Sequence, residues 1–298
     1  MPVTRFICPD GETIETGSCL ASCRMSTRCL TLPTIITLLS GIREWNGKPS
    51  TTQLLNGTML EYLKIKHEYA IRPTARAFVL LGTAHHIQLA KPVGKWIAEQ
   101  HWSEEDISGT SDLLEPDEKV PGSHILTDYK SFGSFRVALL LGLVSEVTYP
   151  PDGERYVNSG KWGKAGDIKP VKIWKRNPDK VSAIDEELQL NHYRLLAESS
   201  GFPISRMQLQ VTVRDGGILA ARDRGITEDI YIIPIKRLPD EDVANYFRVK
   251  RLALEHALAH NEMPPPCSEH ESWERRRCKD YCDVAALCPQ GQRVLAGG

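Results

Sequence analysis

The cysteines constrain this chain more than any other residue type. All eight fall into two groups of four, one at each end of the chain, and both groups have the spacing C-x10-C-x3-C-x5-C. The members are Cys8, Cys19, Cys23 and Cys29 in the first group, and Cys267, Cys278, Cys282 and Cys288 in the second. Because three gaps recur unchanged, the pattern predicts two local four-cysteine modules that flank a central core.

Four thiolates in one short segment can close around a tetrahedral metal ion or an iron–sulfur cluster. Two disulfides per module, or buried free cysteines, are the alternatives. The first residues, MPVTRFICPDG, lack the apolar stretch of a secretory signal peptide, and disulfides are rare in reducing compartments. We therefore expect a cytoplasmic protein with a metal centre in each module.

The composition is that of an ordinary globular chain, with 298 residues, 41% hydrophobic and 25% charged. Its apolar stretches, such as 137–141, are far shorter than the roughly 20 residues of a membrane span, so no membrane association is expected. The net charge is −1. This balance excludes nucleic-acid binding driven by overall charge and requires locally clustered basic residues instead.

The periodicity of apolar residues predicts a mixed α/β core. Helices are expected over 30–47, 51–66, 74–92, 134–144, 185–199 and 240–261, and strands over 107–118, 124–132, 207–215 and 229–238. Gly82 falls inside a predicted helix, where it costs about 1 kcal/mol, and therefore indicates close packing. The expected domains are 1–29 and 264–298 for the cysteine modules and 30–263 for the core.

The strongest chemical signal in the core is Asp112 together with Asp128 and Lys130. Residues 128 and 130 of a strand point to one face, so pairing with the strand around Asp112 would bring two carboxylates and an ammonium together. Oxygen ligands suit Mg²⁺ or Mn²⁺, and the lysine can orient water and offset charge on a phosphoryl transition state. A surface ion pair between Asp128 and Lys130 is the alternative.

Four short motifs occur in a particular order: G-x-x-x-H at 82–86, GTSD at 109–112, DYK at 128–130 and Q-x-x-x-Y at 189–193. This set resembles the RecB-like nucleases of the PD-(D/E)XK superfamily, in the branch of RecB, AddB and CRISPR-associated exonucleases. The resemblance spans residues 82–193. It implies a restriction-endonuclease-like core, with a mixed central sheet flanked by helices. It also implies Mg²⁺- or Mn²⁺-dependent hydrolysis of DNA, by exonuclease action on single-stranded or end-containing substrates.

The same resemblance assigns roles to individual residues. His86, Asp112 and Asp128 correspond to the metal ligands, and Lys130 to the catalytic lysine. Gln189 corresponds to a residue that supports the active site, and Tyr193 to one that holds the DNA strand. These two lie four positions apart on a predicted helix and share a face. His85 competes with its neighbour His86. Adjacent helical residues point about 100° apart, so only one can face the metal, and the spacing from Gly82 favours His86.

Several relatives hold one [4Fe–4S] cluster with one cysteine before the nuclease core and three after it. On that scheme Cys29 would join Cys278, Cys282 and Cys288. The identical spacing of the two quartets instead favours two complete sites. We expect Zn²⁺ at both, because self-contained sites need no cluster assembly, with [4Fe–4S] as the alternative.

The segment 150–180 carries eight Lys/Arg against four Asp/Glu, with Trp162 and Trp174 among them. Lys172, Lys175 and Arg176 are therefore candidates for binding single-stranded DNA through phosphate contacts and stacking, and a solvated charged loop is the alternative. The sequence has no Walker A loop and hence no ATPase of its own. A further alternative is a subunit of a larger machine, with a helicase or integrase as its partner. The rival function is a non-catalytic nucleic-acid-binding subunit.

Overall fold

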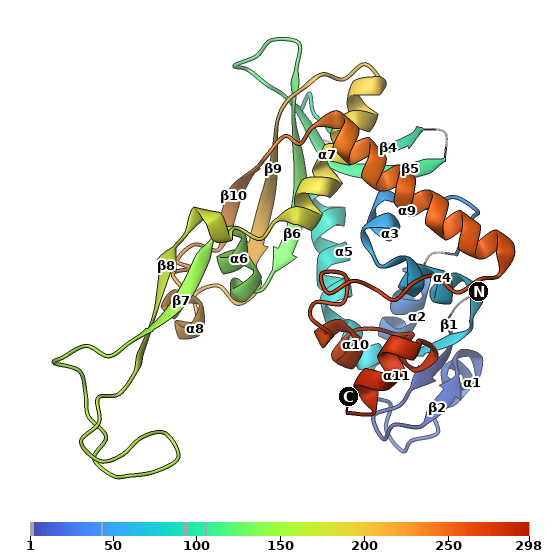
Figure 1. Ribbon diagram of the computed structural model, residues 1–298. Helices are drawn as coiled ribbons and strands as arrows, with labels where there is room; N and C mark the ends of the chain where they lie inside the picture. Colours follow the sequence, from blue (N-terminus) through green and yellow to red (C-terminus); the bar gives the residue numbers. More distant parts are fainter. Residues whose placement is uncertain (1–2, 43, 92–93, 105, 298) are drawn as a thin grey trace.

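A five-stranded mixed sheet forms the centre of the molecule in a computed structural model that describes residues 3–42, 44–91, 94–104 and 106–297 (Figure 1). The strand order is β10-β9-β6-β5-β4, in which β6 and β9 are parallel and the other neighbours are antiparallel. The strands are β4 (Ile97–Glu104), β5 (Ile107–Pro116), β6 (His124–Phe132), β9 (Ile204–Val213) and β10 (Ile230–Ile235). The predicted α/β class is confirmed.

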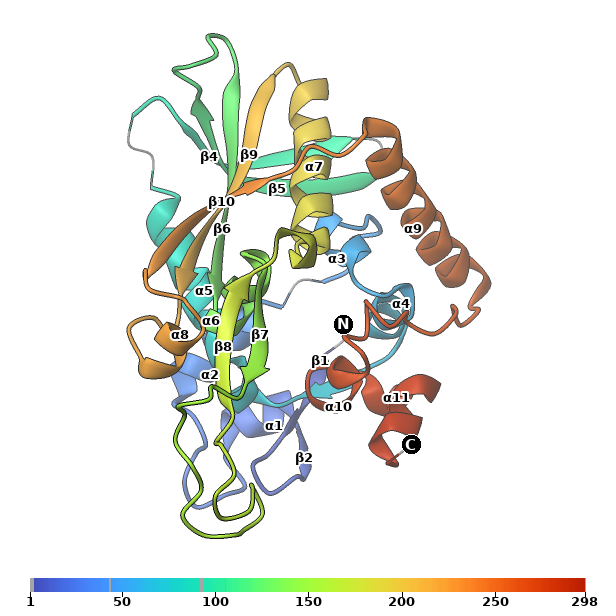
Figure 2. The ribbon, with the colours of Figure 1, turned by 60° about the vertical axis from the view of Figure 1, so that its left-hand side comes forward.

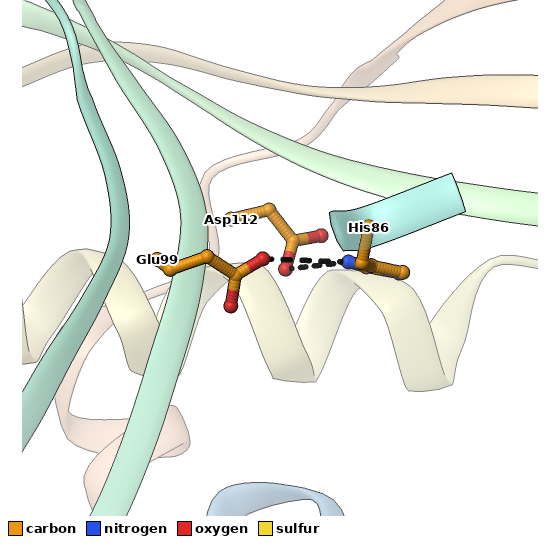
Figure 3. A group of neighbouring side chains, drawn as sticks. All are labelled: His86, Glu99 and Asp112. Carbon is orange, nitrogen blue, oxygen red and sulfur yellow. Dashed lines mark ion pairs between the residues drawn. The ribbon is translucent and has the colours of Figure 1, made fainter. Parts of the chain in front are cut away.

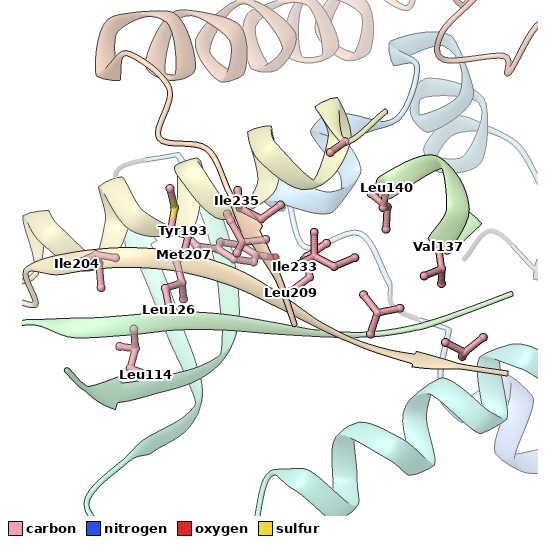
Figure 4. Close-up of a cluster of buried hydrophobic side chains, with 14 of the residues drawn as sticks. Leu114, Leu126, Val137, Leu140, Tyr193, Ile204, Met207, Leu209, Ile233 and Ile235 are labelled. Atoms are coloured by element: carbon pink, nitrogen blue, oxygen red, sulfur yellow. The ribbon is translucent and has the colours of Figure 1, made fainter. Parts of the chain in front are cut away.

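Two helices lie on opposite sides of this sheet (Figure 4). α7 (Ile184–Ser199) buries Leu190 and Leu196 in a cluster with Leu209 of β9. Acidic residues occupy its first turn, where they complement the helix dipole. α5 (Ala77–Leu89) packs on β6 from the other side. The core between α7 and the sheet therefore fixes the strands that carry the predicted site residues.

A second buried cluster joins the C-terminal module to the core. α3 (Thr51–Leu55), α4 (Thr58–Lys66) and α9 (Asp240–His260) meet Cys267, Cys282, Val284 and Cys288 around it. The C-terminal module also contains the helices α10 (Arg276–Asp280) and α11 (Pro289–Leu295). α3 and α4 were predicted as one helix. The chain breaks at Gly57, where an added Cβ would overlap the sulfur of Cys267. Ion pairs from Lys250 to Glu271 (2.5 Å) and from Arg76 to Asp283 (2.7 Å) strengthen this attachment.

The N-terminal module is built into a separate small sheet. β1 (Val3–Ile7) pairs antiparallel with β2 (Thr13–Glu15) and parallel with β3 (Tyr69–Ile71). α1 (Thr16–Ala21) and α2 (Leu32–Ser40) complete this unit, whose buried cluster contains Phe6, Cys19 and Ile35. The buried cluster of the predicted module 1–29 therefore also includes Ile35 of α2 and Ile71 of β3.

A two-stranded arm projects from the core (Figures 1 and 2). It consists of β7 (Leu143–Thr148), β8 (Val171–Arg176) and the segment 149–170 between them. The helix predicted through residue 144 is wrong at its end, because α6 (Ser134–Leu140) stops before Gly142, which has a φ of 68°. An added Cβ there would collide with the carbonyl of Asn177. The apolar run therefore divides into a helix and a strand.

The remaining elements are short. They are α8 (Leu219–Asp223) and the 3₁₀ turns Pro73–Arg76, Pro178–Lys180 and Ala285–Leu287. None of the helices in the described ranges has the length and apolar character needed to cross a membrane.

Candidate metal centre

A cavity of about 1020 Å³ lies among α5, α7, strands β4 to β6 and the segment 44–53. The motif residues gather on its wall. Those that line it are Gly82, His86, Asp112, Asp128, Lys130, Gln189 and Tyr193. Four motifs scattered over more than a hundred residues thus meet in one space, as their common order predicted.

Three side chains form a cluster that matches a divalent metal site (Figure 3). His86 Nδ1 of α5 lies 3.3 Å from Asp112 Oδ1 of β5 and 3.7 Å from Glu99 Oε1 of β4. The other Asp112 oxygen accepts a 2.7 Å hydrogen bond from the Tyr129 amide, which fixes the carboxylate. One imidazole and two carboxylates are ligands that Mn²⁺ and Mg²⁺ accept.

Glu99 was not identified from the sequence. The pairs Ala98–Leu113 and Gln100–Ser111 place it across the ladder from Asp112. Its φ of 50° lies in the left-handed region, which is costly for a residue with a Cβ and is concentrated at functional sites. No motif marks this residue. The signal that could have found it is the antiparallel pairing of β4 with the strand that carries GTSD.

The second half of the site is a hydrogen-bonded network around Asp128. Pairing of Leu113 with Thr127 puts Asp128 opposite Asp112, as predicted. Asp128 is 3% exposed and lies 2.7 Å from Lys130 Nζ. Gln189 donates to Asp128 Oδ1 (3.3 Å) and accepts from Lys130 Nζ (3.1 Å). The structure therefore brings the carboxylate, the ammonium and the amide into one arrangement.

Tyr193 extends this network along α7. Its hydroxyl accepts a 3.1 Å hydrogen bond from Gln189 Nε2, one turn earlier on the same face. An added Cβ at Gly109 would lie 2.7 Å from the Tyr193 ring. The glycine of GTSD therefore lets this ring pack against β5. Gly82 shows the opposite: an added Cβ would meet no atom within 4 Å, so the close packing predicted there is wrong.

The electrostatics of the network fit a bound cation. The pKa of Asp128 is raised to about 6, because burial and the neighbouring Asp112 carboxylate outweigh the opposing effect of Lys130. Burial alone would lower the pKa of Lys130, but the adjacent Asp128 outweighs it and this pKa lies above its ordinary value. Asp128 Oδ2 is the oxygen that pairs with Lys130 Nζ at 2.7 Å. A metal ion here would stabilise the ionised carboxylates.

His85 has a different polar partner from His86. Its Nε2 is 3.1 Å from Thr212 Oγ1 of β9, and its ring meets Tyr129 edge-on at 6.0 Å. Burial lowers the pKa of His85, whereas the hydrogen bond to Asp112 raises that of His86. The helix thus turns His86, and not His85, toward the carboxylates.

We expect His86→Ala to weaken Mn²⁺ binding by more than the roughly 10- to 100-fold that changes outside the ligand shell cost. His85→Ala is the matched control on the same helix and should leave the affinity within about threefold of wild type. Isothermal titration with Mn²⁺ measures both. Equal losses in the two variants would contradict the helix orientation.

The arm holds the basic residues predicted to bind DNA, and none of them lines the cavity. Lys175 pairs with Glu146 at 2.8 Å, and Lys172 Nζ lies 5.4 Å above the Trp174 ring. Arg176 is exposed at the end of β8. The structure does not bring these three residues together with the carboxylates.

The thiols of each cysteine quartet gather at one place, and all eight cysteines are free of disulfides. Burial raises the pKa of Cys19, and neighbouring Cys23, Cys29 and Cys8 raise it further. Burial raises that of Cys267 to about 11, with Glu271, Cys288 and Cys282 adding to the shift. For Cys278, burial and then Cys288 have the same effect. Cys29 thus lies beside Cys19.

Four thiolates suit either Zn²⁺ or a [4Fe–4S] cluster. Zinc at both quartets, with [4Fe–4S] as the alternative, therefore stays a prediction.

Comparisons with known proteins add little to this geometry. No family model and no curated protein matches the chain. A solved structure, "Crystal structure of SSO0001", aligns over 86% of this chain and 92% of its own with 15% identity and a TM-score of 0.41. At that score the likeness defines neither the fold family nor the activity of this chain.

Proposed function

We propose that this protein is a metal-dependent deoxyribonuclease of the RecB-like PD-(D/E)XK type that acts on single-stranded or end-containing DNA. The observation that carries the proposal is the convergence of two groups in one cavity. The His86, Glu99 and Asp112 cluster adjoins the Asp128, Lys130 and Gln189 network. A surface ion pair between Asp128 and Lys130 would not need a buried carboxylate or a supporting amide.

The ligand set defines where a cation would be held. His86, Asp112 and Asp128 supply the nitrogen and oxygen ligands that the resemblance implies, and Glu99 adds a further carboxylate. When bound, Mg²⁺ or Mn²⁺ supplies a nucleophilic water of lowered pKa and neutralises charge on the phosphate.

Lys130 contributes a charge held in a fixed place, and Gln189 holds that charge in position. The ammonium of Lys130 is held between the Asp128 carboxylate and the Gln189 carbonyl oxygen, at 2.7 Å and 3.1 Å. Held there, it can orient the attacking water and stabilise the negative charge that builds on phosphate oxygens. Gln189 contacts both partners and fixes their relative orientation, so we assign it a positioning role.

The cysteine modules are proposed to carry two structural centres, with Zn²⁺ at both and [4Fe–4S] as the alternative. The arm is proposed as a second nucleic-acid contact outside the cavity. Its Trp162 is 79% exposed, with Lys161 Nζ 5.4 Å from the ring. An exposed aromatic ring beside a cation suits stacking and phosphate contact.

The direct test incubates purified protein with 5′-labelled linear and circular single strands in Mn²⁺, Mg²⁺ or EDTA. The proposal expects metal-dependent shortening of the linear strand and no reaction in EDTA. The circle reports whether an end is required. Binding of both substrates without any cleavage in Mn²⁺ would instead support the non-catalytic subunit.

A further inference from the structure

We infer that the cavity contains a nucleotide subsite facing the carboxylates, formed by Trp45, Lys48 and the bare helix surface at Gly82. It would hold one base and one phosphate of a single polynucleotide strand next to the cleaved bond. The inference rests on the proposed function for the class of ligand, and the residues that form the subsite belong to no motif except Gly82.

Trp45 provides a preset aromatic surface. It lines the cavity, and it also packs against the buried cluster that contains Leu54 and Phe247. One part of the ring is therefore held by the core while another part borders open space. An indole fixed in this way can stack on a base without losing further side-chain freedom, and stacking tolerates any base sequence.

Lys48 places a cation on the same wall. Its Nζ donates a 2.7 Å hydrogen bond to Ser103 Oγ of β4. Among the described residues that line the cavity, the lysines are Lys48 and Lys130. Because Lys130 lies in the metal site, Lys48 on the adjacent wall can contact a phosphate one step away from the reacting one.

The segment that carries both residues is anchored at its end. The Ser108 amide of β5 donates to the Pro49 carbonyl at 3.1 Å. Ser50 caps α3 in a reciprocal pair with Gln53, whose side chain accepts from the Ser50 amide at 3.0 Å. This wall of the cavity is therefore part of the fold and keeps a defined position relative to β5.

Gly82 supplies the opposite wall. Glycine destabilises a helix interior relative to alanine, and here neither a left-handed φ nor a packed neighbour requires it. The residue lines the cavity, where an added Cβ would meet only open space. A bare helix surface at this point leaves room for a sugar–phosphate backbone beside His86.

The test measures binding of a fluorescent single-stranded oligonucleotide by anisotropy, with Ca²⁺ in place of Mg²⁺ so that the strand stays intact. We expect Trp45→Ala to weaken binding roughly 5- to 150-fold, the range for loss of one stacked base. Trp45→Phe should remain within about threefold of wild type. Lys48→Ala should lower both the affinity and the slope of its logarithm against salt concentration, by about one phosphate contact.

Gly82→Leu separates an effect on binding from an effect on folding. An added Cβ meets no atom within 4 Å and leucine favours the helix, so the melting temperature should rise while the side chain obstructs the strand and binding falls more than tenfold. The control is Asp117→Asn, which lies outside the cavity and should retain wild-type binding.

The outcomes separate this inference from the nuclease proposal. Cleavage by wild type, with binding indifferent to Trp45, Lys48 and Gly82, would overturn the subsite and leave the nuclease intact. Binding that depends on these residues, without cleavage in Mn²⁺, would support the subsite and remove the nuclease. No measurable binding by wild type would overturn the subsite.

Discussion

Replacing Asp128 by asparagine is expected to abolish hydrolysis and, at the same time, to stabilise the metal-free protein. Asparagine keeps the shape of the side chain but removes the negative charge that a cation needs. Loss of one electrostatic contributor to phosphoryl transfer costs roughly 10²–10³-fold in rate, and loss of a metal ligand adds to this. The measurement is the initial rate on a labelled single strand in Mn²⁺.

The gain in stability follows from the raised pKa of Asp128. Burial brings it to about 6 from 3.8, so the folded protein takes up a proton more readily than the unfolded chain. Above pH 6 the buried carboxylate therefore opposes folding, and this cost disappears as the pH falls from 6 towards 3.8. At pH 8 the asparagine variant should be more stable by about 1–3 kcal/mol, the scale of a two-unit shift.

Asp117 provides the matched control outside the cavity. It lies just past β5, where its carboxylate accepts hydrogen bonds from Ser205 Oγ (2.6 Å) and from the Lys119 amide (2.9 Å). Its hydrogen bond to Ser205 lowers the pKa of Asp117, so ionisation favours the folded state and this contribution fades as the pH falls. Asp117→Asn should lower the melting temperature and keep the activity.

Thermal unfolding in EDTA between pH 5 and 8 tests the gain in stability expected for Asp128→Asn and the loss expected for Asp117→Asn. The difference in melting temperature between Asp128→Asn and wild type should shrink as the pH decreases. Wild-type activity in Asp128→Asn would remove Asp128 from the catalytic site. A lower melting temperature at pH 8 would show that its carboxylate is stabilised in the fold by its neighbours, without need of a cation.

The half of the site that the sequence predicts is the half fixed by short-range geometry. Asp128 and Lys130 share a strand face because side chains alternate with period two, and Gln189 and Tyr193 share a helix face because they lie one turn apart. Only the pairing of β5 with β6 was needed to add Asp112. Local periodicity and a single hairpin therefore suffice for the two aspartates and Lys130, whereas the resemblance was needed to assign Gln189 and Tyr193 to the same site.

The other half depends on long-range contacts, which no local sequence pattern predicts. Glu99 reaches the site because β4 pairs with β5 and adopts a left-handed φ at this residue. Trp45 lines the cavity because α2 ends at Ser40 and the following segment docks against β5. The parallel pairing of β1 with β3 likewise joins segments about sixty residues apart, and no periodicity in either segment specifies its partner.

Gly82 and residues 134–144 illustrate two patterns that were ambiguous. A glycine inside a helix is consistent with close packing or with an open surface, and only the neighbours decide. An apolar run of this length fits a buried helix or a buried strand equally well. Here Gly142 divides it, because the carbonyl of Asn177 occupies the space where a side chain would begin.

The second large effect is the loss of bound metal expected when cysteines of the two quartets are replaced. If each quartet closes on its own centre, Cys19→Ser should halve the metal bound per chain and Cys278→Ser should remove the other half. Metal analysis with acid-labile sulfide measures both, and equal iron and sulfide with brown absorbance would identify clusters. The single-cluster scheme expects Cys19→Ser to be silent and Cys29→Ser to empty the same site as Cys282→Ser.

The structure also predicts which elements should become less protected from hydrogen exchange when each cysteine-bound centre is removed. Cys19 is buried in the cluster with Phe6, Ile35 and Ile71, so loss of the N-terminal centre should loosen β1 and, through their parallel pairing, β3. Hydrogen exchange should then accelerate at Tyr69–Ile71 while α9 stays protected. Cys278→Ser should have the reverse pattern, because the C-terminal module packs on α4 and α9. Accelerated exchange in α9 but not in β3 upon Cys19→Ser would mean that the two quartets hold a single shared centre.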